Sequence, residues 1–325
     1  MTQESQDKFL IFSEGDDVVP ELLSKARGVA NPETTLICVY TGKDAEKKAA
    51  GYIAFGADMV FVNGDTKQDK LQVEAYSELM HQVANQQKPS IIIIGATKFG
   101  NELASRLAQS LDTGCATDCL DFDLDGSNVK MSRLYYGGKF IAKQVFKTSP
   151  AVITIPPRRF ETLQRNEDRK GKIVHIGAAL IEPKARIIDV RPKEQGSVQI
   201  EKADVIVGVG RGLKKKEDLA IIEELAQTVG GVVGGSRPVT EDLQWLPSDV
   251  QIGLSGKKVK PKLYIACGIS GQIQHLVGMR DAKIVVAINV DEQAPIMQEA
   301  DYCIVFDLYK FVPALNKAVK ELLHK

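Results

Sequence analysis

The sequence lacks an excess of charge of either sign. Its 325 residues include 42 Lys and Arg against 42 Asp and Glu, so the formal net charge at pH 7 is zero. Nucleic-acid-binding proteins normally carry a basic face, and disordered chains combine low hydrophobicity with high net charge. The balanced charge and a hydrophobic content of 44% therefore argue against both classes. They predict a globular protein of about two domains.

Long apolar runs are also absent. The longest aliphatic run covers residues 91–94, whereas a membrane-spanning helix needs about 20 apolar residues. The first eight residues are polar and are followed only by the short apolar run 9–12, which is not the pattern of a signal peptide. We expect no membrane insertion.

Cysteine is scarce, and its number, five, is odd. Cys38, Cys267 and Cys303 lie in apolar, strand-like runs, which we interpret as buried reduced thiols. Cys115 and Cys119 have no second cysteine pair or histidine nearby, whereas zinc sites and iron–sulfur clusters need about four ligands. We therefore expect no metal and a reducing compartment such as the cytoplasm.

The order of apolar runs predicts an α/β chain with two doubly wound parallel sheets. In the first part, strand-like runs alternate with stretches of helical spacing, the pattern of a parallel sheet with both faces covered. The expected strands are 9–12, 36–40, 59–62 and 91–94, and the expected helices are 22–29, 45–55, 71–83 and 103–111. Strand-like runs resume at 205–209, 232–233, 263–267, 284–289 and 304–306.

The middle of the chain has a different pattern. Residues 119–155 contain strand-like runs with little room for helices between them, and we expect them to extend the first sheet in antiparallel fashion, with turns at 125–126 and 137–138. Residues 156–200 are rich in Pro and charge and are interpreted as loops and a linker. The predicted domains are therefore 1–190 and 200–325.

Glycine and polar residues follow the predicted strands of the second domain, where open α/β sheets bind ligands. They occur at 208–212, 234–237 and 268–271, and at Asn289 and Asp307. Glycine lets a ligand approach the backbone, and helix N-termini hold phosphate groups. Neither the G-x-G-x-x-G nor the P-loop pattern is complete. The sequence therefore predicts a nucleotide site of another kind.

Arg237, Ser255 and His275 suit a redox ring. A flavin gains negative charge near N1 and O2 when reduced, which a cation or imidazole donor stabilises, and a hydroxyl can hydrogen-bond N5. The imidazole would stabilise this negative charge most strongly if it titrated near neutrality. A surface ion pair, a turn residue and a helix histidine remain alternative interpretations of these residues. No motif indicates a catalytic nucleophile.

At these residues the sequence resembles the alpha subunit of electron transfer flavoprotein. The similarity is carried by GVGRGLKKKEDLAIIEELA, VVGGSRPV, QIGLSGKKVKPKLYIACGISGQIQHLVGM, VVAINVDEQAPIMQEADY and FDLYKFVP. It continues more loosely through IIIIGATKFGNELASRLAQSLDTGCATDC and RLYYGGKFIA. The resemblance therefore extends over nearly the whole chain.

The resemblance implies a bound FAD and a heterodimer with the beta subunit of the family, against which the N-terminal domain packs. It also implies electron transfer from flavin dehydrogenases, such as acyl-CoA dehydrogenases, to a quinone reductase or ferredoxin. An electron-bifurcating complex, with a second FAD in place of AMP in the beta subunit, is an alternative. A nucleotide-binding regulatory module without a redox role is another.

The FAD residues of the family also carry over by resemblance. Arg211 would contact the nucleotide part, Arg237 would supply charge to the ring, the Ser255 hydroxyl would face N5, and His275 would face O2. The full set is Arg211, Ser236, Arg237, Ile252, Gly253, Leu254, Ser255, Ser270, Gly271, Gln272, Ile273, Gln274, His275, Asn289, Asp307 and Leu308. Leu254-Ser255 stands where a Gln-Thr pair is usual, and the loop before Gly253, which contains Trp245, is one residue longer than usual.

Overall fold

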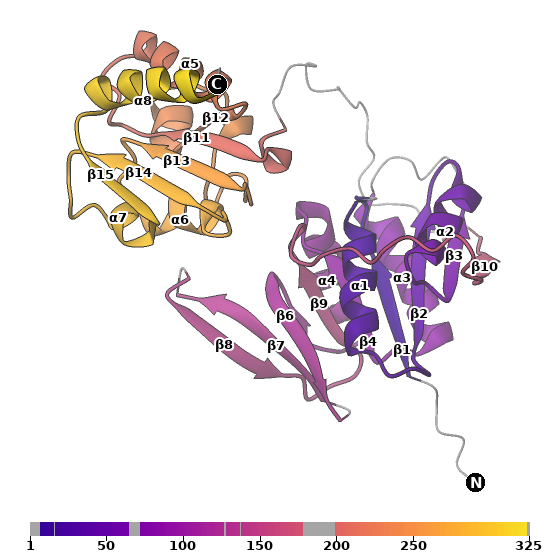
Figure 1. The fold of residues 1–325 in the computed structure, drawn as a ribbon. Coiled ribbons are helices and arrows are strands. Elements are labelled where there is room, and N and C mark those ends of the chain that lie inside the picture. The colour runs from indigo at the N-terminus through magenta and orange to yellow at the C-terminus, as the bar shows by residue number, and fades with distance from the viewer. Residues whose placement is uncertain are drawn as a thin grey trace. The chain divides into compact units, whose positions relative to one another are not determined.

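The computed structural model describes residues 7–15, 17–64, 72–126, 128–136, 138–177 and 199–323. The chain divides into two compact units, Met1–Val190 and Arg191–Lys325, each built on its own parallel sheet (Figure 1). No helix in the described ranges has both the length and the apolar character needed to cross a membrane.

The N-terminal unit contains a seven-stranded parallel sheet with the order β10-β3-β2-β1-β4-β9-β5. Continuous apolar runs such as IIIIG in β4 are buried along their whole length, as expected for strands covered on both faces. The strands are β1 (Lys8–Phe12), β2 (Thr35–Thr41), β3 (Met59–Asn63), β4 (Ile91–Gly95), β5 (Cys115–Ala116), β9 (Ala151–Ile155) and β10 (Lys172–His175).

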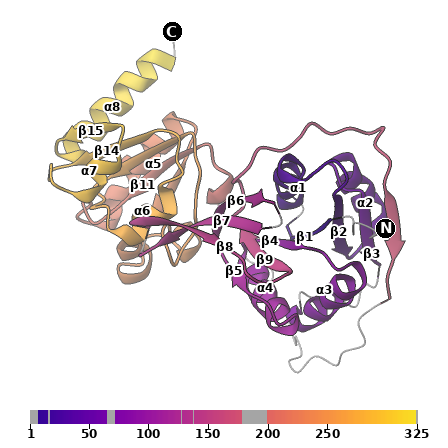
Figure 2. The same cartoon turned by 90° about the horizontal axis from the view of Figure 1, so that it is seen from below.

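Two pairs of helices cover the two faces of this sheet (Figure 2). Phe9 and Ile11 of β1 pack with α1 (Val18–Val29) and α2 (Ala45–Ala54). The alternate residues Leu10 and Phe12 pack with α3 (Val73–Gln87) and α4 (Lys98–Ser110). This alternation follows from the two-residue period of a strand, and the predicted doubly wound parallel sheet is confirmed.

The prediction that residues 119–155 extend this sheet in antiparallel fashion is wrong. Strands β6 (Cys119–Asp125), β7 (Asn128–Tyr135) and β8 (Phe140–Val145) form a separate three-stranded antiparallel sheet. In contrast, β9 pairs in parallel with β4 in the main sheet. The burial of the strands differs accordingly: β9 is buried throughout, whereas β8 buries none of its side chains completely.

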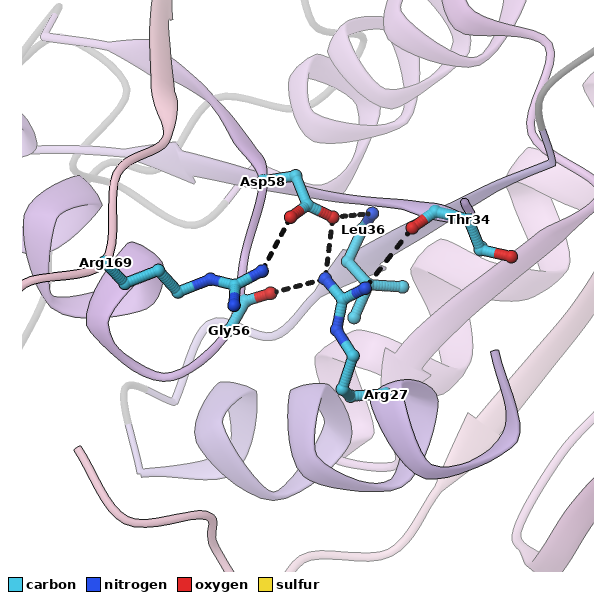
Figure 3. A network of polar contacts seen from close by, with 6 residues as sticks. All are labelled: Arg27, Thr34, Leu36, Gly56, Asp58 and Arg169. Carbon is cyan, nitrogen blue, oxygen red and sulfur yellow. Dashed lines mark hydrogen bonds and ion pairs between the residues drawn. The ribbon is translucent and has the colours of Figure 1, made fainter. Parts of the chain in front are cut away.

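The expectation that residues 156–200 contain only loops and a linker is also wrong, because β10 pairs in parallel with β3. Asp58, which precedes β3, organises this edge of the sheet (Figure 3). Its carboxylate accepts hydrogen bonds from Arg27 at 2.6 Å, from Arg169 at 2.7 Å and from the Leu36 backbone at 2.8 Å. The half-buried carboxylate therefore connects α1, β2 and the segment before β10, which lie far apart in the sequence.

The C-terminal unit contains a five-stranded parallel sheet with the order β12-β11-β13-β14-β15. Helices α5 and α8 pack on one face, and α6 and α7 contribute to the core on the other. The strands are β11 (Val205–Val209), β12 (Val232–Gly235), β13 (Leu263–Cys267), β14 (Val285–Asn289) and β15 (Tyr302–Val305). The helices are α5 (Leu219–Thr228), α6 (Ile273–Met279), α7 (Pro295–Glu299) and α8 (Leu308–Leu323).

All five cysteines are free thiols, but only some are buried. Cys38 and Cys267 lie inside the sheets, and burial raises the pKa of the Cys267 thiol to about 12. Cys303 is exposed, so its expected burial is wrong. It lies on β15, an edge strand whose side chains are mostly exposed.

Candidate functional site

A cleft of about 770 Å³ opens at the carboxyl ends of the C-terminal strands. This volume lies in the range of small-molecule and cofactor sites. Its walls come from the turns after β11 and β13, from the segments that follow β12, β14 and β15, and from the loop 251–255. The cleft therefore occupies the edge at which doubly wound sheets bind ligands.

The fold brings nearly all of the predicted site residues into this one cleft. Those that line it are Arg211, Ser236, Arg237, Ile252, Gly253, Leu254, Ser255, Ser270, Gln272, Gln274, His275, Asn289, Asp307 and Leu308. Gly271 and Ile273 do not line it. A Cβ atom at Gly271 would lie 2.2 Å from the backbone nitrogen of Ile296, so this glycine packs against the start of α7.

Three glycines allow the turns after β11 and β13 to pack backbone against backbone. The Gly210 and Gly212 amides donate to the carbonyls of Cys267 and Gly268, both at 3.0 Å. A Cβ atom at Gly210 would lie 2.3 Å from the Gly268 oxygen, and one at Gly212 would lie 2.5 Å from the Gly268 Cα. These glycines are therefore required for the packing of the two turns that form this part of the cleft wall.

Two guanidinium groups line the cleft without a partner of their own. Arg211 and Arg237 are exposed, and neither side chain makes a hydrogen bond or an ion pair with the described residues. Asp307 is engaged differently, because its carboxylate accepts a hydrogen bond of 2.8 Å from the Tyr309 amide at the start of α8. The two arginines are therefore available to an anionic ligand.

His275, on α6, is buried and neutral in the wall of the cleft. Burial lowers the pKa of its imidazole to about 4, and the backbone of Ile252 opposes this effect only partly. The ring nitrogen Nε2 lies 2.9 Å from the hydroxyl of Tyr264. The condition of an imidazole that titrates near neutrality is therefore not met, because the His275 side chain is buried rather than in solvent.

The hydrogen bond with Tyr264 assigns the imidazole tautomer. Tyr264 is completely buried, and burial raises the pKa of its hydroxyl. That hydroxyl has no other partner in the described chain, so it donates to Nε2, which leaves the proton of the neutral ring on Nδ1. Nδ1 is itself buried and without a partner among the described residues. His275 therefore places a buried Nδ1–H group in the wall of the cleft, with the Ile252 backbone as its neighbour.

The cleft also contains residues that sequence reasoning missed. They are Lys214, Pro238, Gln251, Val290, Asp291, Ala294, Phe306 and Tyr309. Most are within three residues of a predicted position, so extending each motif along its turn would have found them. Gln251, directly before Ile252, donates a hydrogen bond of 2.9 Å to the Ser255 hydroxyl.

The donor set fits the FAD implied by the sequence resemblance. The two unpaired guanidinium groups suit the negative charge of a pyrophosphate and of a reduced flavin ring. The unpartnered Nδ1 of His275 and the hydroxyl of Ser255 supply donors for the polar edge of a flavin ring.

Comparisons with known proteins agree with this fit. The electron transfer flavoprotein domain matches residues 14–180, and the electron transfer flavoprotein FAD-binding domain matches residues 199–280. The electron transfer flavoprotein subunit alpha of Thermoanaerobacterium thermosaccharolyticum is 38% identical over 94% of both chains. That of Bacillus subtilis is 37% identical, again over 94% of both.

A third relative extends the comparison. The acryloyl-CoA reductase electron transfer subunit beta of Anaerotignum propionicum is 34% identical, over 93% of this chain and 91% of that protein. The identity of all three relatives exceeds 30% over almost the full length. The chain belongs to the electron transfer flavoprotein alpha-subunit family, its role is electron transfer, and its cofactor is FAD.

Proposed function

We propose that this chain holds FAD in the C-terminal cleft and serves as an electron carrier that transforms no substrate of its own. Bound FAD supplies reversible electron acceptance. Arg211, Asn289 and Asp307 hold its nucleotide end, while Arg237, Ser255 and His275 contact the ring. The observation that carries this proposal is the convergence of unpaired donors on one cleft.

The three ring contacts have different roles. Arg237 stabilises the negative charge that the ring gains on reduction, because its guanidinium has no competing partner in the described chain. The Nδ1–H group of neutral His275 donates to O2, where charge also accumulates. The Ser255 hydroxyl meets N5. Together they set the reduction potential without performing a chemical step on a substrate.

Arg237→Ala is expected to lower the reduction potential of bound FAD by about 60 mV, which corresponds to ~1.4 kcal/mol for one electron. The loss of a cation destabilises the reduced ring more than the oxidised ring. Arg237→Lys should restore part of the potential, since an ammonium lacks the planar fork of guanidinium. Spectroelectrochemical titration of the flavin-loaded protein measures these potentials.

Lys283→Ala is the control for loss of a positive charge, because Lys283 is exposed in the same unit and does not line the cleft. Its potential should remain that of the wild type. A potential equally unchanged in Arg237→Ala would contradict the assignment of Arg237 to the ring.

We also propose that the N-terminal unit packs on a beta subunit. Large apolar side chains on β8 and the turn before it are exposed, namely Tyr136, Phe140, Ile141 and Val145. The rings of Tyr136 and Phe140 contact each other, with centroids 5.9 Å apart. Apolar patches of this kind mark protein interfaces.

The chain produced alone is therefore expected to be poorly soluble or low in flavin, and co-production with its beta subunit should correct both. Size-exclusion chromatography with the ratio of flavin to protein absorbance measures this. A monodisperse, fully loaded monomer would show that the partner is dispensable.

The electron donors in this proposal are flavin dehydrogenases, acyl-CoA dehydrogenases among them, and the acceptor is a quinone reductase or ferredoxin. The cytoplasm is the proposed compartment, because all five thiols are free. The flavin content of the heterodimer separates the two modes of action. One FAD with AMP indicates a simple carrier, and two FAD molecules indicate an electron-bifurcating complex.

A further inference from the structure

A short chain of hydrogen bonds lies behind the Ser255 hydroxyl. The side-chain nitrogen Nε2 of Gln251 donates to Ser255 Oγ at 2.9 Å. The hydroxyl of Thr240 lies 3.3 Å from the amide oxygen of Gln251, and it also reaches the backbone carbonyl of Arg237 at 3.2 Å. Gln251 and Thr240 are only 4% and 2% exposed, so this pairing is protected from water and its loss would leave buried polar groups unpaired.

The loop holds Gln251 in place from several directions. Its backbone carbonyl accepts from the Lys257 amide at 2.7 Å, which closes the loop on itself. A Cβ atom at Gly256 would lie 2.4 Å from that carbonyl oxygen and 2.9 Å from Cγ of Gln251. The Leu254 amide donates to the Gln274 carbonyl at 2.7 Å. The side-chain amide therefore reaches Ser255 from a constrained backbone.

This geometry decides what Ser255 can offer to the cleft. A serine hydroxyl has one proton to donate and two lone pairs. Because Gln251 donates to Oγ, one lone pair is occupied on the buried side and the proton is free to turn toward the cleft. A hydrogen bond received by a hydroxyl also strengthens the one that it donates.

We infer that Gln251 is a positioning residue that makes Ser255 a hydrogen-bond donor toward N5 of oxidised flavin. The inference rests on the proposed function, since it requires the ring to lie beside Ser255. Gln251 acts on the ring only through Ser255. Thr240, whose buried hydroxyl lies 3.3 Å from the amide oxygen, is the nearest polar side chain behind the amide.

The test uses the flavin-loaded heterodimer reconstituted with ¹⁵N-labelled FAD. The ¹⁵N chemical shift of N5 in the oxidised state reports the hydrogen bond, and the reduction equilibrium at a fixed poise reports its energetic effect. Gln251→Leu should move the N5 shift toward that of flavin without this hydrogen bond. It should also favour reduced flavin about threefold to tenfold, the range of one neutral hydrogen bond. Thr240→Val should give a smaller change in the same direction.

A double-mutant cycle with Ser255→Ala separates positioning from a merely structural role. If Gln251 acts through Ser255, adding Gln251→Leu to Ser255→Ala should change neither readout further. Additive effects, or a shift toward oxidised flavin in Gln251→Leu, would overturn the inference. The fluorescence of Trp245, the only tryptophan in the chain, reports folding of the C-terminal unit, and Gln251→Met is the fallback if Gln251→Leu does not fold.

The same experiment separates failure of the Gln251 inference from failure of the proposed function. No change of the N5 shift in Ser255→Ala would contradict the proposed placement of the ring. A change in Ser255→Ala with none in Gln251→Leu would overturn the role of Gln251 and leave the proposed function intact.

Discussion

Gly268→Ala is expected to destabilise the C-terminal unit by about 2–5 kcal/mol and to abolish retention of FAD. Gly268 has a φ of +61°, a conformation that costs a residue with a Cβ atom roughly 1–2 kcal/mol. The added Cβ would also lie 2.6 Å from the Gly212 Cα. The neighbouring atom belongs to the backbone, so the collision forces the turns after β11 and β13 apart, at an overpacking cost of about 1–3 kcal/mol.

Gly230→Ala is a matched control for this prediction. Gly230 follows α5 and has nearly the same φ, +66°, but a Cβ there would meet no atom within 4 Å. The Gly230→Ala variant should be destabilised only by the backbone strain, roughly 1–2 kcal/mol, and should retain FAD. Urea unfolding followed by Trp245 fluorescence measures the stability of the C-terminal unit, and flavin absorbance after gel filtration measures retention. Equal losses in the two variants would contradict a close contact between the turns.

His275 is expected to make the stability of the C-terminal unit depend on pH, with about 3 kcal/mol lost between pH 6.5 and pH 4. Burial lowers the folded-state pKa of the imidazole from 6.5 to about 4. Between these values the unfolded chain binds a proton that the folded chain does not, so stability falls as pH falls. The contribution of neutral His275 to the free energy of unfolding is complete above pH 6.5. Below that pH the free energy of unfolding falls by at most about 1.4 kcal/mol per pH unit.

Urea unfolding at several pH values, again followed by Trp245 fluorescence, tests this dependence. His275→Gln should remove most of the slope between pH 6.5 and pH 5, because glutamine does not titrate and can still accept a hydrogen bond from Tyr264. His175→Gln is the control, since His175 is exposed in the N-terminal unit, and it should leave the slope unchanged. A slope retained in His275→Gln would show that other groups produce it.

The sequence by itself determined the two parallel sheets and the edge of the second sheet at which the cleft lies. Continuous apolar runs separated by stretches of helical spacing predict strands buried on both faces. This pattern lies within short stretches of the sequence, so it can be recognised without knowledge of distant contacts. The glycines at 208–212 and 268–271 and the polar residues at Asn289 and Asp307 follow strands. Parallel topology therefore brings them to one edge of the sheet, regardless of the conformation of the loops. The family resemblance placed Arg237, Ser255 and His275 within that edge.

Only the tertiary structure decided features that depend on contacts between distant segments. The separation of β6–β8 from the main sheet and the pairing of β10 with β3 depend on which faces other elements cover. The packing of Gly271 against Ile296 has no pattern in the sequence. The burial that keeps His275 neutral and the hydrogen bond that Ser255 accepts from Gln251 were equally hidden. The burial of a residue and the direction of its hydrogen bonds depend on all of its neighbours in space. Periodicity along the chain shows only which side of its own helix or strand a residue occupies.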